Sequence, residues 1–238
     1  MTDSLLTVRT VAGENPVLLI HGLGSNSRSD WEASGFVDAL TSAGRGAILV
    51  DLPGHGDGPA LARGEVTTGG IAAALAAAVD EHAGGRVDVI GYSLGARLAW
   101  ALAATGRVNR LVLGGLSPME PFALVNLDAL ADAAAGKGAP ADQITGMFAG
   151  MLGAPGLDPT SVIALIGALA AEPFDATKDV PQVPTLFVSG EGDQMAQGVE
   201  QMVAGVPGAT LVRVPGDHFG ALASPEFRAA AIGFVTES

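Results

Sequence analysis

The amino-acid sequence predicts a single domain of the α/β class, built on a mostly parallel, doubly wound sheet. Short apolar runs alternate with helical stretches along most of the 238 residues. The runs are continuously apolar, which is typical of strands buried on both faces. Most of them end in glycine-rich loops, as expected where strands and helices are joined in βαβ units.

The elements follow one another in a regular order. An edge strand is expected at residues 5–11, and buried strands at residues 17–20, 47–50, 87–90, 108–115, 184–190 and 209–214. Helices are expected at residues 31–40, 71–82, from 94 to near 106, 195–204 and 225–235. Glycine and proline clusters separate these elements and mark the turns between them.

Residues 117–183 interrupt this alternation. They contain three apolar helical stretches, at residues 121–135, 141–152 and 159–171, and no strand candidate. We interpret this segment as a helical cap insertion above the sheet. The predicted organisation is therefore a core formed by residues 1–116 and 184–238, with a cap formed by residues 117–183.

The composition argues against several classes of partner. The formal net charge of −13 argues against nucleic acid and anionic membrane surfaces, because both require clustered Lys and Arg. The chain has no cysteine, which excludes disulfides, thiol catalysis and thiolate metal sites. The four histidines lack metal-ligand spacing, so we expect no metal and no cofactor. No signal peptide or membrane span is recognisable, which predicts a cytoplasmic protein, and the oligomeric state is not predicted.

A serine lies at the apex of a predicted strand–turn–helix unit. The turn reads Gly91-Tyr92-Ser93-Leu94-Gly95, with an apolar strand before it and an Ala/Leu-rich helix after it. Flanking glycines allow the strand and the helix to approach closely, and the strained turn exposes the serine hydroxyl. The alternative is that Ser93 only caps the helix, because serine is a favoured N-cap residue.

A base and an acid follow two later strands. His218 comes after the last strand, and Asp193 comes after the strand before it. The carboxyl ends of parallel strands meet at one edge of a sheet, so Ser93, Asp193 and His218 are expected to converge. Asp217 and Glu191 are alternative acids, and Asp193 is favoured because adjacent side chains such as Asp217 and His218 rarely hydrogen-bond.

Four motifs together resemble those of the α/β-hydrolase superfamily. They are the loop His21-Gly22-Leu23-Gly24, the turn Asp51-Leu52-Pro53-Gly54-His55-Gly56, the serine turn, and the pair of Asp193 and His218. The order Ser, Asp, His also matches this family. The resemblance is to a serine carboxylesterase- or lipase-like member, and it implies an α/β-hydrolase fold with a small helical cap inserted after the sixth strand.

The resemblance also implies a role for each site residue. Ser93 is the expected nucleophile, His218 the base and then the acid, and Asp193 the residue that orients His218. The backbone N–H groups of Leu94 and Leu23 are the expected oxyanion hole, with Gly22 as an alternative to Leu23. His21 and His55 are expected to be structural. The proposed substrate pocket consists of Gly22, Tyr92, Phe122, Met147, Phe148, Met151 and Phe219.

These assignments predict a serine hydrolase that cleaves carboxylic esters or lactones of neutral, moderately apolar small molecules through an acyl-enzyme. The cap carries eight acidic residues and only Lys137 and Lys178 as bases, so it would repel dianionic substrates. Arg28 is the one cation well placed for a substrate carboxylate, although a solvent-facing position is favoured for it. The alternatives are a carbon–carbon bond hydrolase or lyase with the same triad, and a non-catalytic ligand-binding protein.

Overall fold

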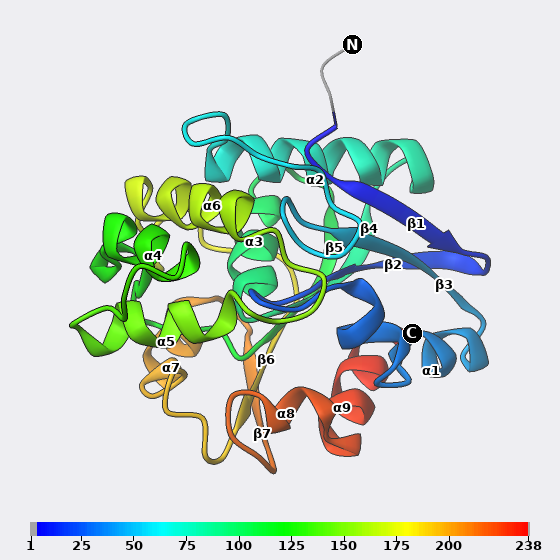
Figure 1. Ribbon diagram of the computed structural model, residues 1–238. Coiled ribbons are helices and arrows are strands. Elements are labelled where there is room, and N and C mark those ends of the chain that lie inside the picture. The colour runs from blue at the N-terminus through cyan, green and yellow to red at the C-terminus, as the bar shows by residue number, and fades with distance from the viewer. Residues whose placement is uncertain (1–3, 238) are drawn as a thin grey trace.

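The computed structural model describes residues 4–237 and is organised around a seven-stranded sheet (Figure 1). The strand order is β1-β3-β2-β4-β5-β6-β7. The β1 strand pairs with β3 in antiparallel fashion, and every other neighbouring pair is parallel. The strands are β1 (Thr7–Val11), β2 (Glu14–Ile20), β3 (Arg45–Asp51), β4 (Val87–Tyr92), β5 (Val108–Gly114), β6 (Thr185–Gly190) and β7 (Thr210–Val214).

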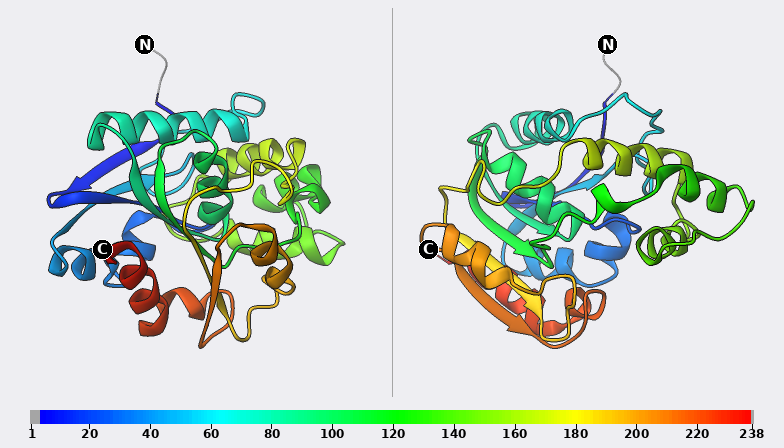
Figure 2. Two further views of the ribbon diagram at one scale, coloured as in Figure 1. Left: turned by 180° about the vertical axis from the view of Figure 1, so that it is seen from behind. Right: turned by 90° about the vertical axis from the view of Figure 1, so that its left-hand side faces the viewer.

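Helices cover both faces of the sheet (Figure 2). One face is covered by α2 (Thr68–Ala83), α3 (Leu94–Ala103) and α7 (Val199–Gly205), and the other by α1 (Phe36–Ser42), α8 (Gly220–Ala223) and α9 (Pro225–Thr236). Successive strand residues alternate between the two cores, as Leu18 and Leu19 illustrate. This arrangement explains why the strands are continuously apolar, because both of their faces are buried.

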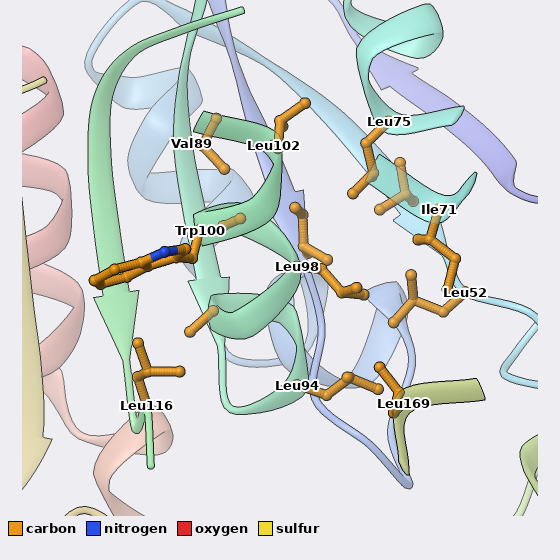
Figure 3. Close-up of a cluster of buried hydrophobic side chains, with 14 of the residues drawn as sticks. Leu52, Ile71, Leu75, Val89, Leu94, Leu98, Trp100, Leu102, Leu116 and Leu169 are labelled. Atoms are coloured by element: carbon orange, nitrogen blue, oxygen red, sulfur yellow. The ribbon is translucent and has the colours of Figure 1, made fainter. Parts of the chain in front are cut away.

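The helix that follows the serine turn, α3, packs into the core through its leucine side chains. Figure 3 shows that Leu98 points towards Ile71 and Leu75 of α2, whereas Trp100 lies on another side of α3. The indole N–H of Trp100 donates to the carbonyl of Lys178 at 3.1 Å. Packing on several sides holds α3, and with it the serine turn, in a fixed position.

Residues 117–183 form η2 (Phe122–Leu124), α4 (Leu127–Ala134), α5 (Gln143–Met151) and α6 (Pro159–Ala171). The three α-helices begin at side-chain caps, with Asn126, Asp142 and Asp158 accepting hydrogen bonds from backbone N–H groups of the first turn. This segment follows β5, the fifth strand along the described chain, and the expected position after a sixth strand was wrong. The five strands expected before residue 117 are the strands β1 to β5 that the described residues form, so the position after a sixth strand counted one strand too many.

The cap helices form one group beside the core, and backbone hydrogen bonds tie this group to the turn after β3 (Figure 1). The amide of Gly56 donates to the carbonyl of Gly156 at 2.8 Å, and the amide of Asp158 donates to the carbonyl of Gly54 at 2.9 Å. The hydroxyl of Ser161 accepts a hydrogen bond from the amide of Leu61. These contacts anchor the start of α6 to the core.

Three helix predictions were wrong in their boundaries. The expected helix at residues 121–135 is divided into η2 and α4, because Val125 and Asn126 between them are extended. In place of one helix at residues 31–40, the chain forms a π-helical turn, η1 (Arg28–Glu32), and then α1. Gly35, with φ of 79°, separates the two elements because a left-handed residue interrupts a helix. Likewise Gly198, with φ of 83°, delays α7 to Val199, four residues after its expected start. Within residues 4–237, no helix has the length and apolar character needed to cross a membrane.

Candidate active site

Ser93 lies in a strained turn between β4 and α3. Its φ and ψ are 52° and −113°, a conformation that side-chain-bearing residues rarely adopt. The turn requires glycine on both sides, because a Cβ on Gly95 would lie 2.0 Å from the carbonyl oxygen of Ile20 and one on Gly91 would lie 2.4 Å from that of Gly95. The Ser93 side chain makes no capping hydrogen bond, so the alternative of a simple helix cap is wrong.

The structure brings Ser93, His218 and Asp193 together from the ends of three strands. Nε2 of His218 lies 2.9 Å from Oγ of Ser93, and Nδ1 lies 2.9 Å from Oδ2 of Asp193. The Asp193 side chain is fully buried, and its Oδ1 accepts hydrogen bonds from the amides of Met195 and Ala196. The carboxylate is therefore fixed at the imidazole, on the side opposite the serine.

The two alternative acids do not contact His218. Oδ1 of Asp217 accepts hydrogen bonds from the amides of Phe219 and Gly220, at 3.2 and 2.8 Å, and so closes its own turn. Glu191 is exposed to solvent. Asp193 is the carboxylate that the fold places at the imidazole.

Tyr92 is hydrogen-bonded to the loop that carries His218. Its hydroxyl donates to the backbone carbonyl of His218 at 2.5 Å, and the two rings lie 5.6 Å apart. Burial raises the pKa of the Tyr92 phenol, which therefore stays protonated and able to donate. This contact connects the residue before Ser93 with the loop that carries His218.

The loop after β2 passes directly beside the serine. A Cβ added to Gly22 would lie 3.5 Å from Cβ of Ser93. The amide of Gly22 donates to Oδ2 of Asp30 at 3.0 Å, so this donor is already in use. By contrast, the amides of Leu23 and Leu94 donate to no group within residues 4–237. Leu23 and Leu94 are thus two backbone donors with capacity for a ligand, in the loop next to Ser93 and in the residue after it.

Sequence reasoning missed Asp30. Its carboxylate also accepts a hydrogen bond from the hydroxyl of Ser25 at 2.5 Å, and so it fixes both ends of the loop around Leu23. Burial raises the pKa of Asp30, despite these hydrogen bonds. No separate motif marks this residue, because it follows a run of small polar residues that resembles an ordinary loop.

His21 and His55 are buried and bind backbone groups next to the site. Nε2 of His21 accepts from the amide of Leu52, and its Nδ1 lies 2.8 Å from the carbonyl of Gly22. Nδ1 of His55 lies 2.8 Å from the carbonyl of Pro53. Burial lowers the pKa of both imidazoles, that of His55 to about 3, so both are neutral near pH 7.

A cavity of about 270 Å³ opens beside Ser93 and is mainly apolar. All seven residues proposed for the pocket line it: Gly22, Tyr92, Phe122, Met147, Phe148, Met151 and Phe219. The sequence did not single out several others on its wall, including Arg97, Met119, Glu120, Phe174 and Leu222. Arg28 does not line it. Instead its exposed guanidinium pairs with Asp57 at 2.9 Å.

The charged groups on the cavity wall are few. They are Asp30, Arg97 and Glu120. Within residues 4–237, no cluster of three or more His, Cys, Asp or Glu side chains is placed to hold a metal ion.

Comparison with known proteins places this chain in a family. A family model described as alpha/beta hydrolase fold matches residues 15–145, more than half of the chain. The chain belongs to the alpha/beta hydrolase fold family. The match includes the loop after β2 and the serine turn, and it ends within the cap.

The chain is similar to curated relatives over part of its length. It is 35% identical over 112 residues to a 2-hydroxy-6-oxononadienedioate/2-hydroxy-6-oxononatrienedioate hydrolase of Burkholderia vietnamiensis, covering 44% of this chain and 38% of that protein. The chain therefore spans well under half the length of that relative.

Solved structures match the chain over nearly its whole length. A hydrolase from Pseudomonas aeruginosa has a TM-score of 0.76 at 25% identity, covering 96% of this chain and 93% of that one. A thermophilic esterase from Thermogutta terrifontis has a TM-score of 0.75 at 24% identity, covering 96% and 91%. These matches agree with the fold predicted from the sequence.

Proposed function

We propose that this protein is a serine carboxylesterase that cleaves neutral, moderately apolar esters or lactones through an acyl-enzyme. The observation that carries the proposal is the hydrogen-bonded series from Ser93 through His218 to Asp193, which opens onto an apolar cavity. A serine hydroxyl becomes a nucleophile when an oriented base takes its proton, and this geometry supplies that base.

We assign one group to each step of the proposed reaction. Oγ of Ser93 attacks the ester carbonyl while Nε2 of His218 accepts the proton, and Asp193 stabilises the imidazolium that forms. The tetrahedral oxyanion accepts hydrogen bonds from the amides of Leu23 and Leu94. His218 then returns the proton to the leaving alcohol. A water molecule then attacks the acyl-enzyme while His218 takes its proton. The bond between the acyl carbon and Oγ of Ser93 breaks, the acid is released, and His218 returns the proton to Oγ.

The assignment of Leu23 rests on Asp30. Because the Gly22 amide already donates to Asp30, Gly22 has no N–H left for the oxyanion. The same hydrogen bond fixes the orientation of the peptide that precedes the Leu23 amide. We therefore give Asp30 a positioning role, and Leu23 the donor role.

The cavity wall supports a neutral substrate. Its lining is dominated by methionine, leucine and phenylalanine side chains, which favour apolar acyl or alcohol groups. The two lysines of the cap pair with cap aspartates at 3.3 and 3.5 Å and lie in solvent. A dianionic substrate would find no unpaired lysine there to offset its desolvation.

A carbon–carbon bond hydrolase is the second candidate. It is favoured by the similarity to hydrolases named for 2-hydroxy-6-oxononadienedioate, and the same triad can serve that reaction. The similarity covers only 38% and 41% of those two proteins, and the acidic cap of this chain is unsuited to a dianionic diketone. The ester reaction is therefore the first candidate.

One set of assays separates these functions. Purified protein and Ser93→Ala are compared on 4-nitrophenyl esters of two to eight carbons, and on a vinylogous diketone dianion. We expect ester hydrolysis in the wild type and a loss of at least about 10³-fold in Ser93→Ala. Turnover of the diketone without ester hydrolysis would favour the second candidate.

A further experiment addresses a non-catalytic ligand-binding protein. A fluorophosphonate probe reacts with an activated serine whether or not the acyl-enzyme turns over. Labelling at Ser93 together with continuous ester turnover supports the proposal. Labelling with a single stoichiometric burst and no turnover would indicate a binding protein instead.

A further inference from the structure

An arginine lies on the cavity wall one helical turn after the nucleophile. Arg97 of α3 is 5% exposed, and it is the only Lys or Arg among the cavity-lining residues of the described chain. Its Nη2 donates to the carbonyls of Leu169 and Glu172, at 3.0 and 2.6 Å, and its guanidinium carbon lies 5.3 Å from the ring centre of Phe122. The guanidinium is thus held rigidly between the core and the cap.

Glu120 of the cap supplies the counter-charge. Its Oε2 lies 2.6 Å from Nη1 of Arg97, and the two side chains are only 6% and 12% exposed. The same carboxylate accepts hydrogen bonds from the amides of Phe122 and Phe174. Backbone donors on two cap segments therefore fix the carboxylate against the guanidinium.

The Glu120 carboxylate covers the side of the guanidinium that the backbone carbonyls leave open. Nη1 of Arg97 is buried, and Oε2 of Glu120 faces it at 2.6 Å. A buried N–H of a guanidinium normally has an acceptor, and carboxylate oxygens are its strongest partners. Arg97 therefore has the character of an anion site that an internal carboxylate fills.

We propose that Glu120 is a specificity-determining residue, which occupies the anion-binding face of Arg97 and so makes the cavity select uncharged substrates over substrates that end in a carboxylate. The inference rests on the proposed ester hydrolysis and names the substrate class of that site. With Glu120 in place, an entering carboxylate meets a neutral pair and loses its hydration without gaining a cation. Without the Glu120 charge, Arg97 is a cation on the wall of the Ser93 cavity that has lost its direct ion-pair partner.

The test compares two substrates of one shape. They are the mono-4-nitrophenyl ester of adipic acid and 4-nitrophenyl 6-methylheptanoate, in which an isopropyl group replaces the carboxylate. The readout is the ratio of kcat/KM for the anionic ester to that for the neutral ester. In Glu120→Gln we expect this ratio to rise at least about tenfold, which corresponds to about 1.4 kcal/mol.

Two controls assign the effect to the pair. The double variant Arg97→Gln/Glu120→Gln has no charge at either position, so its ratio must return to near the wild-type value. Asp128→Asn removes a cap charge that is 94% exposed and lies outside the cavity lining, so it must leave the ratio unchanged. An equal rise in Asp128→Asn would show a general effect of net charge and overturn the proposal.

Failure of this inference is distinguishable from failure of the proposed function. If the wild type hydrolyses the neutral ester but Glu120→Gln leaves the ratio unchanged, this inference is wrong and ester hydrolysis stands. If the wild type hydrolyses neither ester, binding of hexanoate to Ser93→Ala and to Ser93→Ala/Glu120→Gln is measured by calorimetry. Binding at least tenfold tighter to the double variant supports the inference, and equal binding overturns it.

If Glu120→Gln does not fold, the other member of the pair is substituted instead. Arg97→Gln leaves Glu120 as an unpaired anion in the cavity wall. The ratio for the anionic ester must then fall below the wild-type value by about threefold or more, because like charges repel in a poorly solvated site. An unchanged ratio in this variant would overturn the proposal.

Discussion

His55 is expected to make the protein sensitive to mild acid. Its ring is fully buried, Nδ1 binds the carbonyl of Pro53, and Nε2 has no partner within the described residues. Burial lowers its pKa from the ordinary 6.5 to about 3. In the unfolded chain the imidazole takes up a proton near pH 6.5, whereas in the folded protein it does not. Stability is therefore fully present above pH 6.5 and falls between pH 6.5 and pH 3.

The magnitude follows from the difference in pKa. One pKa unit corresponds to about 1.4 kcal/mol, so from pH 6.5 to pH 5 the His55 contribution to the unfolding free energy falls by about 2 kcal/mol. In His55→Asn the amide can still donate to the carbonyl of Pro53, but no proton is taken up. We therefore expect the loss of stability between pH 7 and pH 5 to be about 2 kcal/mol smaller in His55→Asn than in the wild type.

Urea unfolding at pH 7, 6 and 5, followed by circular dichroism, measures this difference. The absolute stability of His55→Asn at pH 7 is expected to be lower, because the smaller side chain leaves a cavity. Only the pH dependence tests the reasoning. His82→Asn, on the exposed end of α2, is the matched control for removing a histidine. Parallel pH profiles of the unfolding free energy for the wild type and His55→Asn would refute the role of His55 in acid sensitivity.

Three further predictions concern the site and the serine turn. Asp193→Asn is expected to lower kcat for 4-nitrophenyl esters by roughly 10³- to 10⁴-fold with little change in KM, because the imidazolium of His218 loses its stabilising charge; a loss below tenfold would point to another acid. Asp30→Ala is expected to lower kcat about tenfold or more, since the oxyanion loop loses its fixed orientation, and unchanged steady-state kinetics would contradict this role. Gly95→Ala is expected to lower the unfolding free energy by more than about 3 kcal/mol, because its Cβ would lie 2.0 Å from a carbonyl oxygen of β2. Gly85→Ala, whose Cβ would lie in open space, is the control in the same denaturation assay.

The sequence predicted the convergence of Ser93, Asp193 and His218 from one geometric rule. Parallel strands place their carboxyl ends at one edge, so residues that follow different strands meet although they lie far apart in the chain. Apolar runs identified those strands, because burial on both faces produces a strong and local signal. Their catalytic roles remain proposals.

The Arg97–Glu120 pair carried no such signal. Arg97 lies in a helix whose other residues are apolar, and nothing in the local pattern shows that a cap residue 23 positions later will neutralise it. Asp30 is a similar case. It lies in a loop where only the folded backbone brings the Gly22 amide to its carboxylate. Interactions between a core helix and an inserted cap depend on tertiary packing, which periodicity does not describe.

The backbone hydrogen bonds between the turn after β3 and the start of α6 have a kinetic consequence. Because Gly54 and Gly56 bind the cap directly, substrate exchange by a hinged opening of the whole cap would require breaking these bonds. The exposed side chains at the cavity, Met119, Met147 and Phe219, offer an easier route. Exposed side chains change rotamer in picoseconds to nanoseconds, much faster than domain motions. We therefore expect turnover to be limited by acyl transfer rather than by product release, and to be insensitive to solvent viscosity.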